Sequence, residues 1–372
     1  MKITVDRSFL LKALSHAHGI VERRTTSPIL SNVLLAAHDG HLSITATDLD
    51  MSIVETMPTQ IEAEGTTTVA AQTFYDIVRK LPDGTEIELV EKPENNHMVV
   101  RCGRARFNLP TLPAKDFTTL KTADLPHKFT LSAEQLKGLI ENTRFAISTE
   151  ETRYYLNGIY LHTRTNAENL VLRAVSTDGH RLALADVAEP SGASGIPDVI
   201  IPRKTILELG KLLETTESNV AVSLSLTQIT FEVGRVLLSS RLIDGTFPDY
   251  EKVIPKDNQQ VLTMDRAKFA QAVDRVASVS SEKARGIKMT IEPQKVIVSI
   301  SNNEHGTGLE EIEANYNGKR IIMGFNARYL LDIAQQVTGP DLIFNLSDEN
   351  APAIIKGGKD QHVLYVLMPM RL

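Results

Sequence analysis

The stretch Ser176-Thr177-Asp178-Gly179-His180-Arg181-Leu182 is the most informative part of the sequence. It lies between two apolar runs, 170–175 and 182–187. An Asp-Gly pair between alternating apolar runs is a strong short-range signal for a β-hairpin. A related pair, Thr47-Asp48, occurs earlier in the chain in the same kind of setting. The recurrence of this pair indicates an internal repeat, which would mean that the chain consists of several similar domains.

The remaining sequence repeats one order of elements three times. Apolar residues at helical spacing predict two helices in each repeat: 8–17 and 71–81, then 132–140 and 203–213, then 265–276 and 327–336. The third helix opens with Ser132 and Gln135, which is a capping-box pattern. We therefore predict an α+β protein of three similar domains, 1–125, 128–255 and 257–372, with two helices packed on antiparallel sheets in each.

Strands are expected around these helices from runs of apolar residues bounded by turn residues. The predicted strands are 1–7, 32–37, 42–45, a run after Asp48, 86–89, 98–102, 105–109, 158–162, 170–175, 182–187, 220–224, 229–233, 236–240, 287–291, 296–300, 342–346, 353–356 and 363–368. A turn at 301–303, which contains Asn302, is the expected third counterpart of the two Thr-Asp turns.

Composition indicates a globular protein that does not enter a membrane. The 372 residues suit two or three domains, and 42% of them are hydrophobic. The single cysteine, Cys102, excludes an internal disulfide and fits a reducing compartment. The first residues lack the apolar core of a signal peptide, and no apolar run approaches the roughly 18 residues of a membrane span. We expect a cytoplasmic protein.

The net charge and its distribution along the chain point to different partners. A total of −6 argues against a nucleic-acid partner. However, the helical windows 8–18, 72–81, 132–144, 203–214, 265–276 and 326–336 hold 12 basic and 8 acidic residues, a net of +4, which leaves −10 for the remaining chain. If the helices shared one surface, that surface would attract phosphates. The alternative is six solvated helix faces with a chance imbalance.

Sequence signatures of enzymes are missing. The chain contains no phosphate-binding loop, dinucleotide fingerprint, H-E-x-x-H or G-x-S-x-G motif. One cysteine and ten dispersed histidines give no metal-ligand set. Asp178 and His180 could be half of an acid–base pair, but a single hairpin turn offers neither a nucleophile elbow nor a third partner. We therefore expect no catalytic residues, no metal and no cofactor. The alternative, a hydrolase, requires that His180→Ala abolish an activity.

The end of the chain is unusually apolar. Residues 363–370 are nearly all hydrophobic, and Met368-Pro369-Met370-Arg371-Leu372 follows without a polar tail. Pro369 cannot continue a central strand, so this segment is expected to leave the sheet and pack nearby. Methionines suit a surface that accepts different side chains. The alternative is a docked end of a hydrophobic core.

Several motifs together resemble the bacterial sliding clamps, the β subunits of DNA polymerase III. The resemblance extends over essentially the whole chain. It rests on Arg153-Tyr154-Tyr155-Leu156-Asn157-Gly158, on 177–182, on Phe247-Pro248-Asp249-Tyr250, on Phe325-Asn326 with Tyr329, and on the terminal Met368-Pro369-Met370-Arg371-Leu372. Separate motifs in the right order on a threefold repeat are more specific than any one of them.

The resemblance implies a non-enzymatic processivity factor. Two chains would join head to tail into a closed ring of six similar domains, with the helices lining a hole for duplex DNA. Phosphates would be contacted without reading bases, so the ring could slide. Arg24 matches a family position for DNA contact, and placement in helices adds the other candidates: Arg79, Lys80, Lys137, Arg203 and Lys204. The ring interface would pair the edge near Phe107 with the helix near Val279 of the other chain.

The resemblance also implies a cleft between the second and third domains that binds short hydrophobic peptides. Its expected partners are the replicative polymerase α subunit, the clamp-loader δ subunit, and other polymerases and repair proteins. Leu182 and Met368 would frame an apolar cleft, with His180 and Arg181 as its polar rim. The full expected set is Leu156, Thr177, Gly179, His180, Arg181, Leu182, Pro248, Lys252, Val253, Asn326, Tyr329, Val366, Leu367, Met368, Pro369, Met370 and Arg371.

Two positions depart from the family pattern, and one alternative function remains. Lys252 stands where members often have Arg, and Ala284 where some have an aromatic residue. Either could alter the edge of the cleft, since Lys lacks the planar fork of Arg. The alternative is a three-repeat protein-binding scaffold without a role on DNA. In that case, neutralising Arg24, Arg79 and Lys80 would leave every function intact.

Overall fold

The computed structural model describes residues 1–22, 26–120, 124–166, 169–279, 286–302, 305–358 and 362–371. Within them, one order of elements occurs three times: a strand, a helix, three strands, a further strand, a second helix and three last strands. The first copy has one additional short strand, β5. The repeat confirms the predicted α+β fold of three similar domains.

The first copy contains β1 (Lys2–Asp6), α1 (Arg7–Ile20), β2 (Asn32–His38), β3 (His41–Thr47), β4 (Met51–Pro58), β5 (Gln60–Ala63), β6 (Gly65–Ala70), α2 (Ala71–Lys80), β7 (Glu86–Lys92), β8 (His97–Cys102) and β9 (Ala105–Leu112). The second contains β10 (His127–Ser132), α3 (Ala133–Thr143), β11 (Gly158–Asn166), β12 (Asn169–Thr177), β13 (Arg181–Ala188), β14 (Val199–Pro202), α4 (Arg203–Leu213), β15 (Asn219–Leu224), β16 (Gln228–Val233) and β17 (Val236–Arg241). The third contains β18 (Gln260–Asp265), α5 (Arg266–Ala277), β19 (Gly286–Glu292), β20 (Lys295–Asn302), β21 (Gly306–Asn315), β22 (Ile321–Asn326), α6 (Ala327–Gln336), β23 (Asp341–Leu346), β24 (Ala353–Gly357) and β25 (Val363–Leu367).

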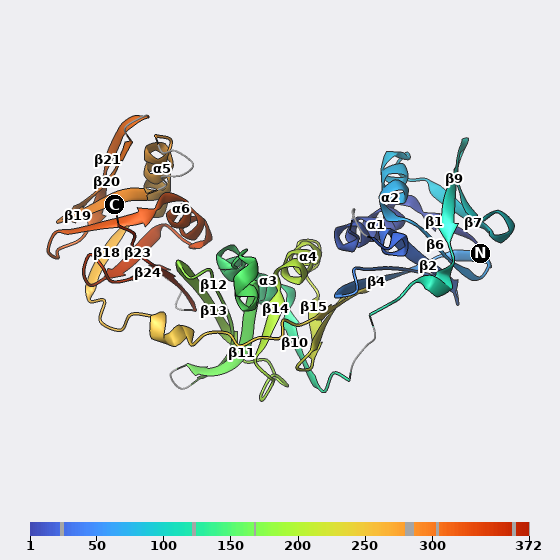
Figure 1. Cartoon of the computed structure of the whole chain (residues 1–372), viewed down its shortest axis with the longest axis horizontal. Coiled ribbons are helices and arrows are strands. Elements are labelled where there is room, and N and C mark those ends of the chain that lie inside the picture. The colour runs from blue at the N-terminus through green and yellow to red at the C-terminus, as the bar shows by residue number, and fades with distance from the viewer. Residues whose placement is uncertain are drawn as a thin grey trace. The chain divides into compact units, whose positions relative to one another are not determined.

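Backbone hydrogen bonds join these strands into two sheets, and many of the strands are labelled in Figure 1. One sheet has 13 strands in the order β10-β15-β16-β17-β4-β3-β2-β6-β9-β8-β7-β1-β5, and the other has 12 in the order β14-β11-β12-β13-β25-β24-β23-β18-β21-β20-β19-β22. The chain forms two compact units, Met1–Leu136 with Pro190–Pro197 and Lys204–Leu242, and Lys137–Glu189 with Asp198–Arg203 and Ile243–Leu372. Each sheet lies within one unit, so the middle copy contributes strands to both.

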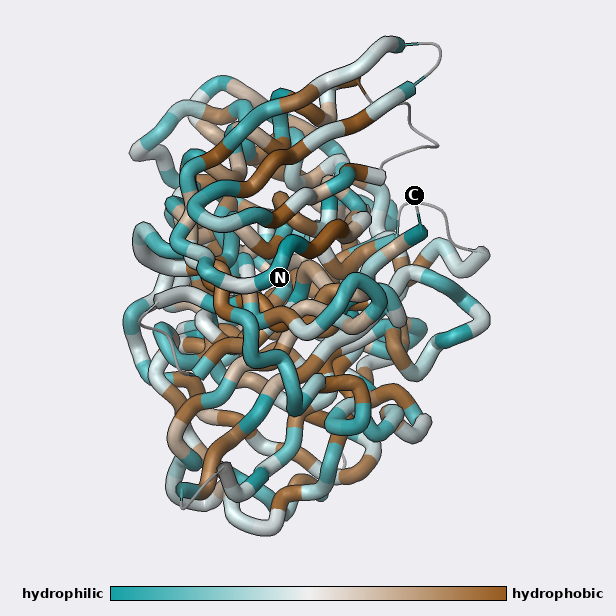
Figure 2. Tube along the Cα trace, turned by 90° about the vertical axis from the view of Figure 1, so that its left-hand side faces the viewer, coloured by the Kyte–Doolittle hydropathy of each residue, from teal (hydrophilic) through white to brown (hydrophobic). Residues whose placement is uncertain are grey.

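Helices cover one face of the sheet within each unit. In the first unit α1 contacts α2, β3 and β4, and in the second α5 contacts α6, β20 and β21. The buried residues of α1 recur every three or four positions and include Leu10, Leu14 and Ala17, which places them on one face. Apolar and polar residues alternate along individual strands (Figure 2), because successive side chains point to opposite faces.

The six predicted helices are confirmed, and each begins within one residue of its predicted start. The predicted capping box is present as well. Ser132 Oγ accepts the backbone N–H of Gln135 at 3.1 Å, and Gln135 Oε1 accepts the N–H of Ser132 at 3.1 Å. These reciprocal bonds satisfy donors that a helix otherwise leaves unpaired.

Several strands were not predicted. They are β5, β6, β10, β14, β18, β21 and β22. Five of them end directly before a helix, so no turn residue separates the alternating pattern of the strand from the helical pattern that follows it. In β21 the solvent-facing positions include Glu310, Glu311 and Glu313, which obscure its apolar pattern. The predicted domain borders at 125–128 and 255–257 remain predictions, because the two compact units divide the chain within its middle copy.

Candidate functional site

The predicted hairpin joins β12 and β13 at Thr177–Arg181. Thr177 Oγ1 donates to the carbonyl of Arg181 at 2.7 Å. Asp178 Oδ1 accepts the backbone N–H groups of His180 at 2.9 Å and Arg181 at 3.0 Å. These are the local side-chain bonds by which Thr and Asp favour turns. The polar side chains of Thr177 and Asp178 therefore stabilise the backbone of the turn.

Gly179 is required at the tip of this turn. Its φ is +87°, a left-handed conformation that glycine adopts without steric cost. A Cβ at this position would lie 2.5 Å from Arg153 Nη1. Gly179 therefore permits a close approach, and the approaching group is the Arg153 guanidinium.

The same turn recurs in the first copy. Thr47 Oγ1 donates to the carbonyl of Met51 at 2.9 Å, and Asp48 Oδ1 accepts the N–H of Met51 at 2.7 Å. The two Thr-Asp turns are thus confirmed as equivalent. In the third copy, Asn302 Oδ1 accepts the N–H of His305 at 3.1 Å, and the predicted turn at 301–303 stays a prediction because it extends outside the described residues.

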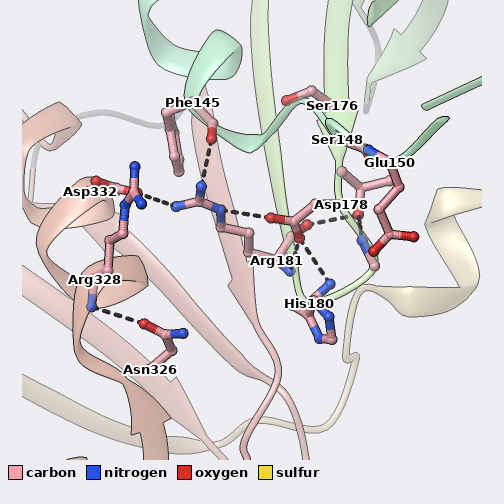
Figure 3. A network of polar contacts seen from close by, with 12 residues as sticks. Phe145, Ser148, Glu150, Ser176, Asp178, His180, Arg181, Asn326, Arg328 and Asp332 are labelled. Carbon is pink, nitrogen blue, oxygen red and sulfur yellow. Dashed lines mark hydrogen bonds and ion pairs between the residues drawn. The ribbon is translucent and has the colours of Figure 1, made fainter. Parts of the chain in front are cut away.

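Arg181 is held in a buried network (Figure 3). Its side chain is 9% exposed and forms ion pairs with Asp332 Oδ2 at 2.6 Å and Asp178 Oδ2 at 3.1 Å. Its Nη2 donates to the carbonyl of Phe145 at 2.6 Å, and its guanidinium lies 4.2 Å from the ring centre of Tyr329. The charge of Arg181 is therefore compensated inside the protein, and its place on the polar rim of the cleft stays a prediction.

The geometry also removes support for an acid–base pair of Asp178 and His180. Both carboxylate oxygens of Asp178 accept bonds from backbone N–H groups or from Arg181. The exposed imidazole of His180 instead stacks with Tyr329, with ring centres 6.3 Å apart. Burial raises the pKa of Tyr329, so its hydroxyl stays protonated near neutral pH.

An apolar cluster lies beneath the predicted cleft. It contains Leu156, Leu182 and Val366, which are 4%, 2% and 1% exposed. The same cluster contains Phe247 and Tyr250 from the segment after β17. The structure thus brings together predicted residues from three distant parts of the sequence, and they form a closed apolar floor.

Leu367 does not belong to this floor. It is fully buried in the other hydrophobic core of the unit, with residues such as Phe344 and Leu330. Successive residues of a strand face opposite sides, so Val366 and Leu367 cannot both face the cleft. The prediction that the Leu367 side chain contacts a peptide is therefore wrong.

The tail leaves the sheet after Leu367, as predicted. The N–H of Met368 donates to the carbonyl of His180 at 2.9 Å, and the N–H of Met370 donates to the carbonyl of Gly324 at 2.8 Å. The Met368 and Met370 side chains are 38% and 41% exposed. The backbone is thus anchored while Met368 remains accessible beside the turn and Met370 remains accessible beside β22.

The remaining predicted cleft residues lie at the borders of this region. Pro248, Lys252 and Val253 are exposed in the segment that follows β17. Lys252 forms an ion pair with Asp249 at 3.0 Å. Asn326 Oδ1 caps α6 by accepting the N–H of Arg328 at 3.0 Å. Thr177 is partly buried, as are Asn326 and Pro369, whereas Arg371 is exposed. Ala284 lies outside the described residues.

A polar pocket of about 490 Å³ adjoins the turn and contains residues that sequence reasoning missed. Its lining includes the predicted residues His180, Arg181, Asn326 and Tyr329. The residues that were not predicted are Arg144, Phe145, Ile147, Ser148, Thr149, Glu150, Asp178, Arg203, Arg328 and Asp332, of which Asp178 and Arg203 had been considered in other roles. These residues come from separate segments, so no local pattern could have indicated the pocket.

The DNA candidates differ in how available their charges are. Arg79 and Lys137 are exposed and pair loosely with neighbours on their own helices at 3.3 Å and 3.8 Å. Lys80 and Arg203 are also exposed. Lys204 is less available, because its Nζ pairs with Asp48 and donates to the carbonyl of Ile20 at 3.0 Å. Arg24 lies outside the described residues.

The interface candidates lie beside strand edges. Phe107 is partly buried on β9, and Val279 follows the end of α5. From 105 to 110, β9 pairs with β8 alone among the described strands, and from 306 to 313, β21 pairs with β20 alone. Each strand thus presents a row of backbone groups that another strand can pair with.

No set of three or more His, Cys, Asp and Glu residues in the described ranges could hold a metal ion. In the same ranges, no helix is long and apolar enough to cross a membrane.

Comparisons with known proteins cover the whole chain. Three family models match in order: DNA polymerase III beta subunit, N-terminal domain, at residues 1–121, its central domain at 130–249, and its C-terminal domain at 251–371. The beta sliding clamp of Caulobacter vibrioides NA1000 is 49% identical over 372 residues, with full coverage of both chains.

Solved structures agree with these matches. A sliding clamp from Bartonella birtlesii, crystallised with griselimycin, superimposes with a TM-score of 0.97 at 47% identity and covers 100% of both chains. A polymerase sliding clamp from Caulobacter crescentus gives a TM-score of 0.95 at 48% identity, again over 100% of both chains.

Proposed function

The chain belongs to the DNA polymerase III beta subunit family, and we propose that two copies of it close into a ring around duplex DNA and tether partner proteins there. Its relatives identify it as a sliding clamp, a non-catalytic processivity factor of DNA polymerase III. The ring, the DNA contacts and the partner cleft are argued separately below.

Strand pairing within the chain is the observation that supports the ring most directly. At the first border between copies, β4 pairs with β17, and at the second, β13 pairs with β25. Each pair joins the fourth strand of one copy to the last strand of the next. The same rule, applied once more, pairs β21 of the third copy with β9 of a first copy. A second chain would supply that β9, and two such junctions would close a ring of six domains.

The register of the two internal junctions makes this proposal specific. Leu238 lies opposite Ile53 at the first junction, and Tyr365 lies opposite Ala183 at the second. Phe107 occupies in β9 the position of Leu238 in β17, because their partners Val100 and Phe231 are each the fourth residue of the preceding strand. Phe107 would therefore lie at the centre of the junction between chains.

The residue opposite Phe107 would be Gly308. Gly308 is the third residue of β21, as Ile53 is of β4 and Ala183 is of β13. Its partner Ile300 is buried, as are Ala46 and Ser176, the partners of the other two. A Cβ on Gly308 would lie 3.4 Å from Val279 Cγ2. Glycine leaves room there for an aromatic ring next to Val279, which suits burial of Phe107.

Exposed basic side chains on the helices would contact the DNA backbone. Arg79, Lys80, Lys137 and Arg203 can each offer a cation to a phosphate without reading a base. The +4 net charge of the helical windows, in a chain of −6, supports this assignment. Lys204 is the weakest candidate, since Asp48 already neutralises it.

The apolar region around the turn would bind short hydrophobic segments of partners. Leu156, Leu182 and Val366 form its floor, and the exposed Met368 and Met370 can adapt to different side chains. The proposed partners are the replicative polymerase α subunit, the clamp-loader δ subunit, and other polymerases and repair proteins. These events would take place in the bacterial cytoplasm, where the chromosome lies.

One experiment tests the ring on DNA. The clamp is loaded by a clamp loader onto nicked circular DNA and onto the same DNA made linear, and retention is followed at raised salt. A closed ring stays on the circle and slides off the free ends of the linear form. Equal retention on both would favour surface binding and contradict the proposal. The scaffold alternative predicts no retention on either, and it also predicts that Arg79→Glu with Lys80→Glu changes no function.

A further inference from the structure

A buried polar network lies next to the apolar floor of the proposed cleft. Arg173 on β12 binds Asp186 on β13 through two hydrogen bonds of 2.7 Å each. Arg173 Nη1 also donates to the hydroxyl of Tyr250 at 3.3 Å, and that hydroxyl lies 3.1 Å from Nε2 of His162 on β11. All four residues are less than a tenth exposed. Neither the ring nor the DNA contacts require this network.

The hydrogen-bond directions define the state of His162. Arg173 is a donor only, so the Tyr250 oxygen accepts its bond and the Tyr250 proton points to His162 Nε2. His162 Nδ1 lies 3.2 Å from the carbonyl of Thr163, which must accept a proton from it. A neutral imidazole with its proton on Nδ1 satisfies the whole chain of bonds. A charged imidazole leaves the Tyr250 proton without an acceptor.

The network is tied to the segment that borders the cleft. Tyr250 begins η6 (Tyr250–Val253) and belongs to the same apolar cluster as Leu182. Phe247 stacks on Tyr160 with ring centres 4.7 Å apart, and Tyr160 stacks on His162 at 4.6 Å. Between and after these two buried anchors lie the exposed residues Pro248, Lys252 and Val253. The placement of this wall therefore depends on how Phe247 and Tyr250 are held.

We propose that His162 and Tyr250 are positioning residues that fix the 247–253 wall of the cleft, and that protonation of His162 releases this wall and weakens partner binding. The proposal rests on the proposed peptide-binding function of the cleft. Its physical basis is that an imidazolium would lie next to the Arg173 cation and would meet a hydroxyl that already accepts a bond from Arg173.

Charged groups of both signs surround His162. The cations are Arg173 on β12 and Arg164 on β11, and the nearby anion is Asp198, which accepts the Tyr160 hydroxyl at 2.8 Å. Glu251, beside Tyr250, is paired with Arg164 at 2.6 Å. Asp186 is engaged by Arg173. Burial is the main cause that lowers the pKa of His162, and the two arginines act in the same direction.

The sign of the pH effect follows from this direction. A histidine whose pKa is lowered in the folded state stabilises that state while it is neutral, above its unfolded value of about 6.5. The stabilisation is lost as the pH falls from about 6.5 towards the lower folded pKa. Partner binding should therefore be constant near neutral pH and weaken under mildly acidic conditions.

The test measures binding of the immobilised replicative polymerase α subunit to the full-length dimer between about pH 7.5 and pH 5.5. Wild-type affinity should fall at least roughly fivefold over this range. His162→Gln should bind within about twofold of wild type at neutral pH, since the Gln oxygen can accept the Tyr250 proton. It should also lose most of the pH dependence. Tyr250→Phe should bind the α subunit more weakly at neutral pH, and its binding should likewise lose most of the pH dependence.

Two controls make the result decisive. His180 is a second histidine at this site, where it lines the polar pocket beside the turn, so His180→Gln should retain the pH dependence if His162 is its source. The dimer mass and thermal transition of each variant report on folding. An unchanged pH profile in folded His162→Gln, or a flat profile in His180→Gln alone, would overturn the proposal. Failure of wild type to bind at neutral pH would instead contradict the proposed cleft.

Discussion

The first and second Thr-Asp turns share one backbone and differ in their side-chain neighbours. In both, the Asp carboxylate accepts two backbone N–H groups. Each turn also accepts a backbone N–H from the last strand of the next copy. The N–H of Arg241, at the end of β17, donates to the carbonyl of Asp50 at 2.8 Å, and the N–H of Met368, directly after β25, donates to the carbonyl of His180 at 2.9 Å. The repeat fixes this geometry, so any special function must come from side chains.

The side chains separate the two turns clearly. Asp48 pairs with Lys204, whose side chain is 41% exposed. Asp178 pairs with Arg181, which is 9% exposed and also reaches Asp332. The donor to the first turn, Arg241, is followed by the partly buried Leu242 and Ile243, whereas the donor to the second turn, Met368, is itself exposed and is followed by the exposed Met370. The comparison shows how a repeated scaffold can carry one specialised docking region.

Replacing the two cations should give the largest difference between the turns. Arg181→Ala leaves the partly buried Asp332 and the Phe145 carbonyl without a partner, and it should cost about 3–5 kcal/mol of unfolding free energy. Lys204→Ala removes a more exposed ion pair and should cost about 1 kcal/mol or less. Urea denaturation of both variants measures the difference. Equal losses would show that the two turns are held alike.

The turn tips give a second contrast, of intermediate size. Gly179→Ala places a side chain at φ +87° and against Arg153 Nη1, so it should cost about 1–3 kcal/mol. Leu49 already adopts φ +79° at the corresponding position. Leu49→Gly should therefore change stability by less than about 1 kcal/mol, since relief of strain offsets the entropy of glycine. Thermal denaturation distinguishes them, and a larger loss in Leu49→Gly would refute the assignment.

The tail gives the third contrast, which concerns binding. A chain ending at Leu367 loses Met368 and Met370 but keeps β25 intact. It should bind the polymerase α subunit at least about tenfold more weakly, a change of about 1.4 kcal/mol. Met370 and Arg371 line one pocket with Gly308 and Leu309 of β21, but the truncation leaves the strands β9 and β21 themselves intact, so its dimer mass should be unchanged. Dissociation of the truncated dimer would mean that the tail is part of the ring interface.

Much of this molecule could be predicted from its sequence, for identifiable reasons. Helical periodicity located the six α-helices of the described residues, and the recurrence of the Thr-Asp pair indicated the repeat. Strands such as β14 and β22 were missed because each runs directly into a helix. The place of Leu367 could have been inferred, since it alternates with Val366 along β25 and must face the opposite core.

The environment of Arg181 could not be predicted in the same way. Its partner Asp332 lies 151 positions away, and the Phe145 carbonyl lies in another segment. Neither contact leaves a local signal, so an arginine at a turn was expected to be exposed. The network of His162 and Tyr250 was invisible for the same reason, because its members are 88 positions apart.

Cysteine cross-linking tests whether the chain's own strand-pairing rule closes the ring. Phe107→Cys and Gly308→Cys are combined with Cys102→Ser, which removes the only native thiol. Opposed residues of antiparallel strands lie about 4.5–5.5 Å apart at their Cα atoms, within reach of a disulfide. After mild oxidation, we expect a covalent dimer in denaturing electrophoresis, and none when Asn108→Cys is used in place of Phe107→Cys. Efficient cross-linking only between Asn108→Cys and Gly308→Cys, or a monomer in every case, would contradict the proposed ring.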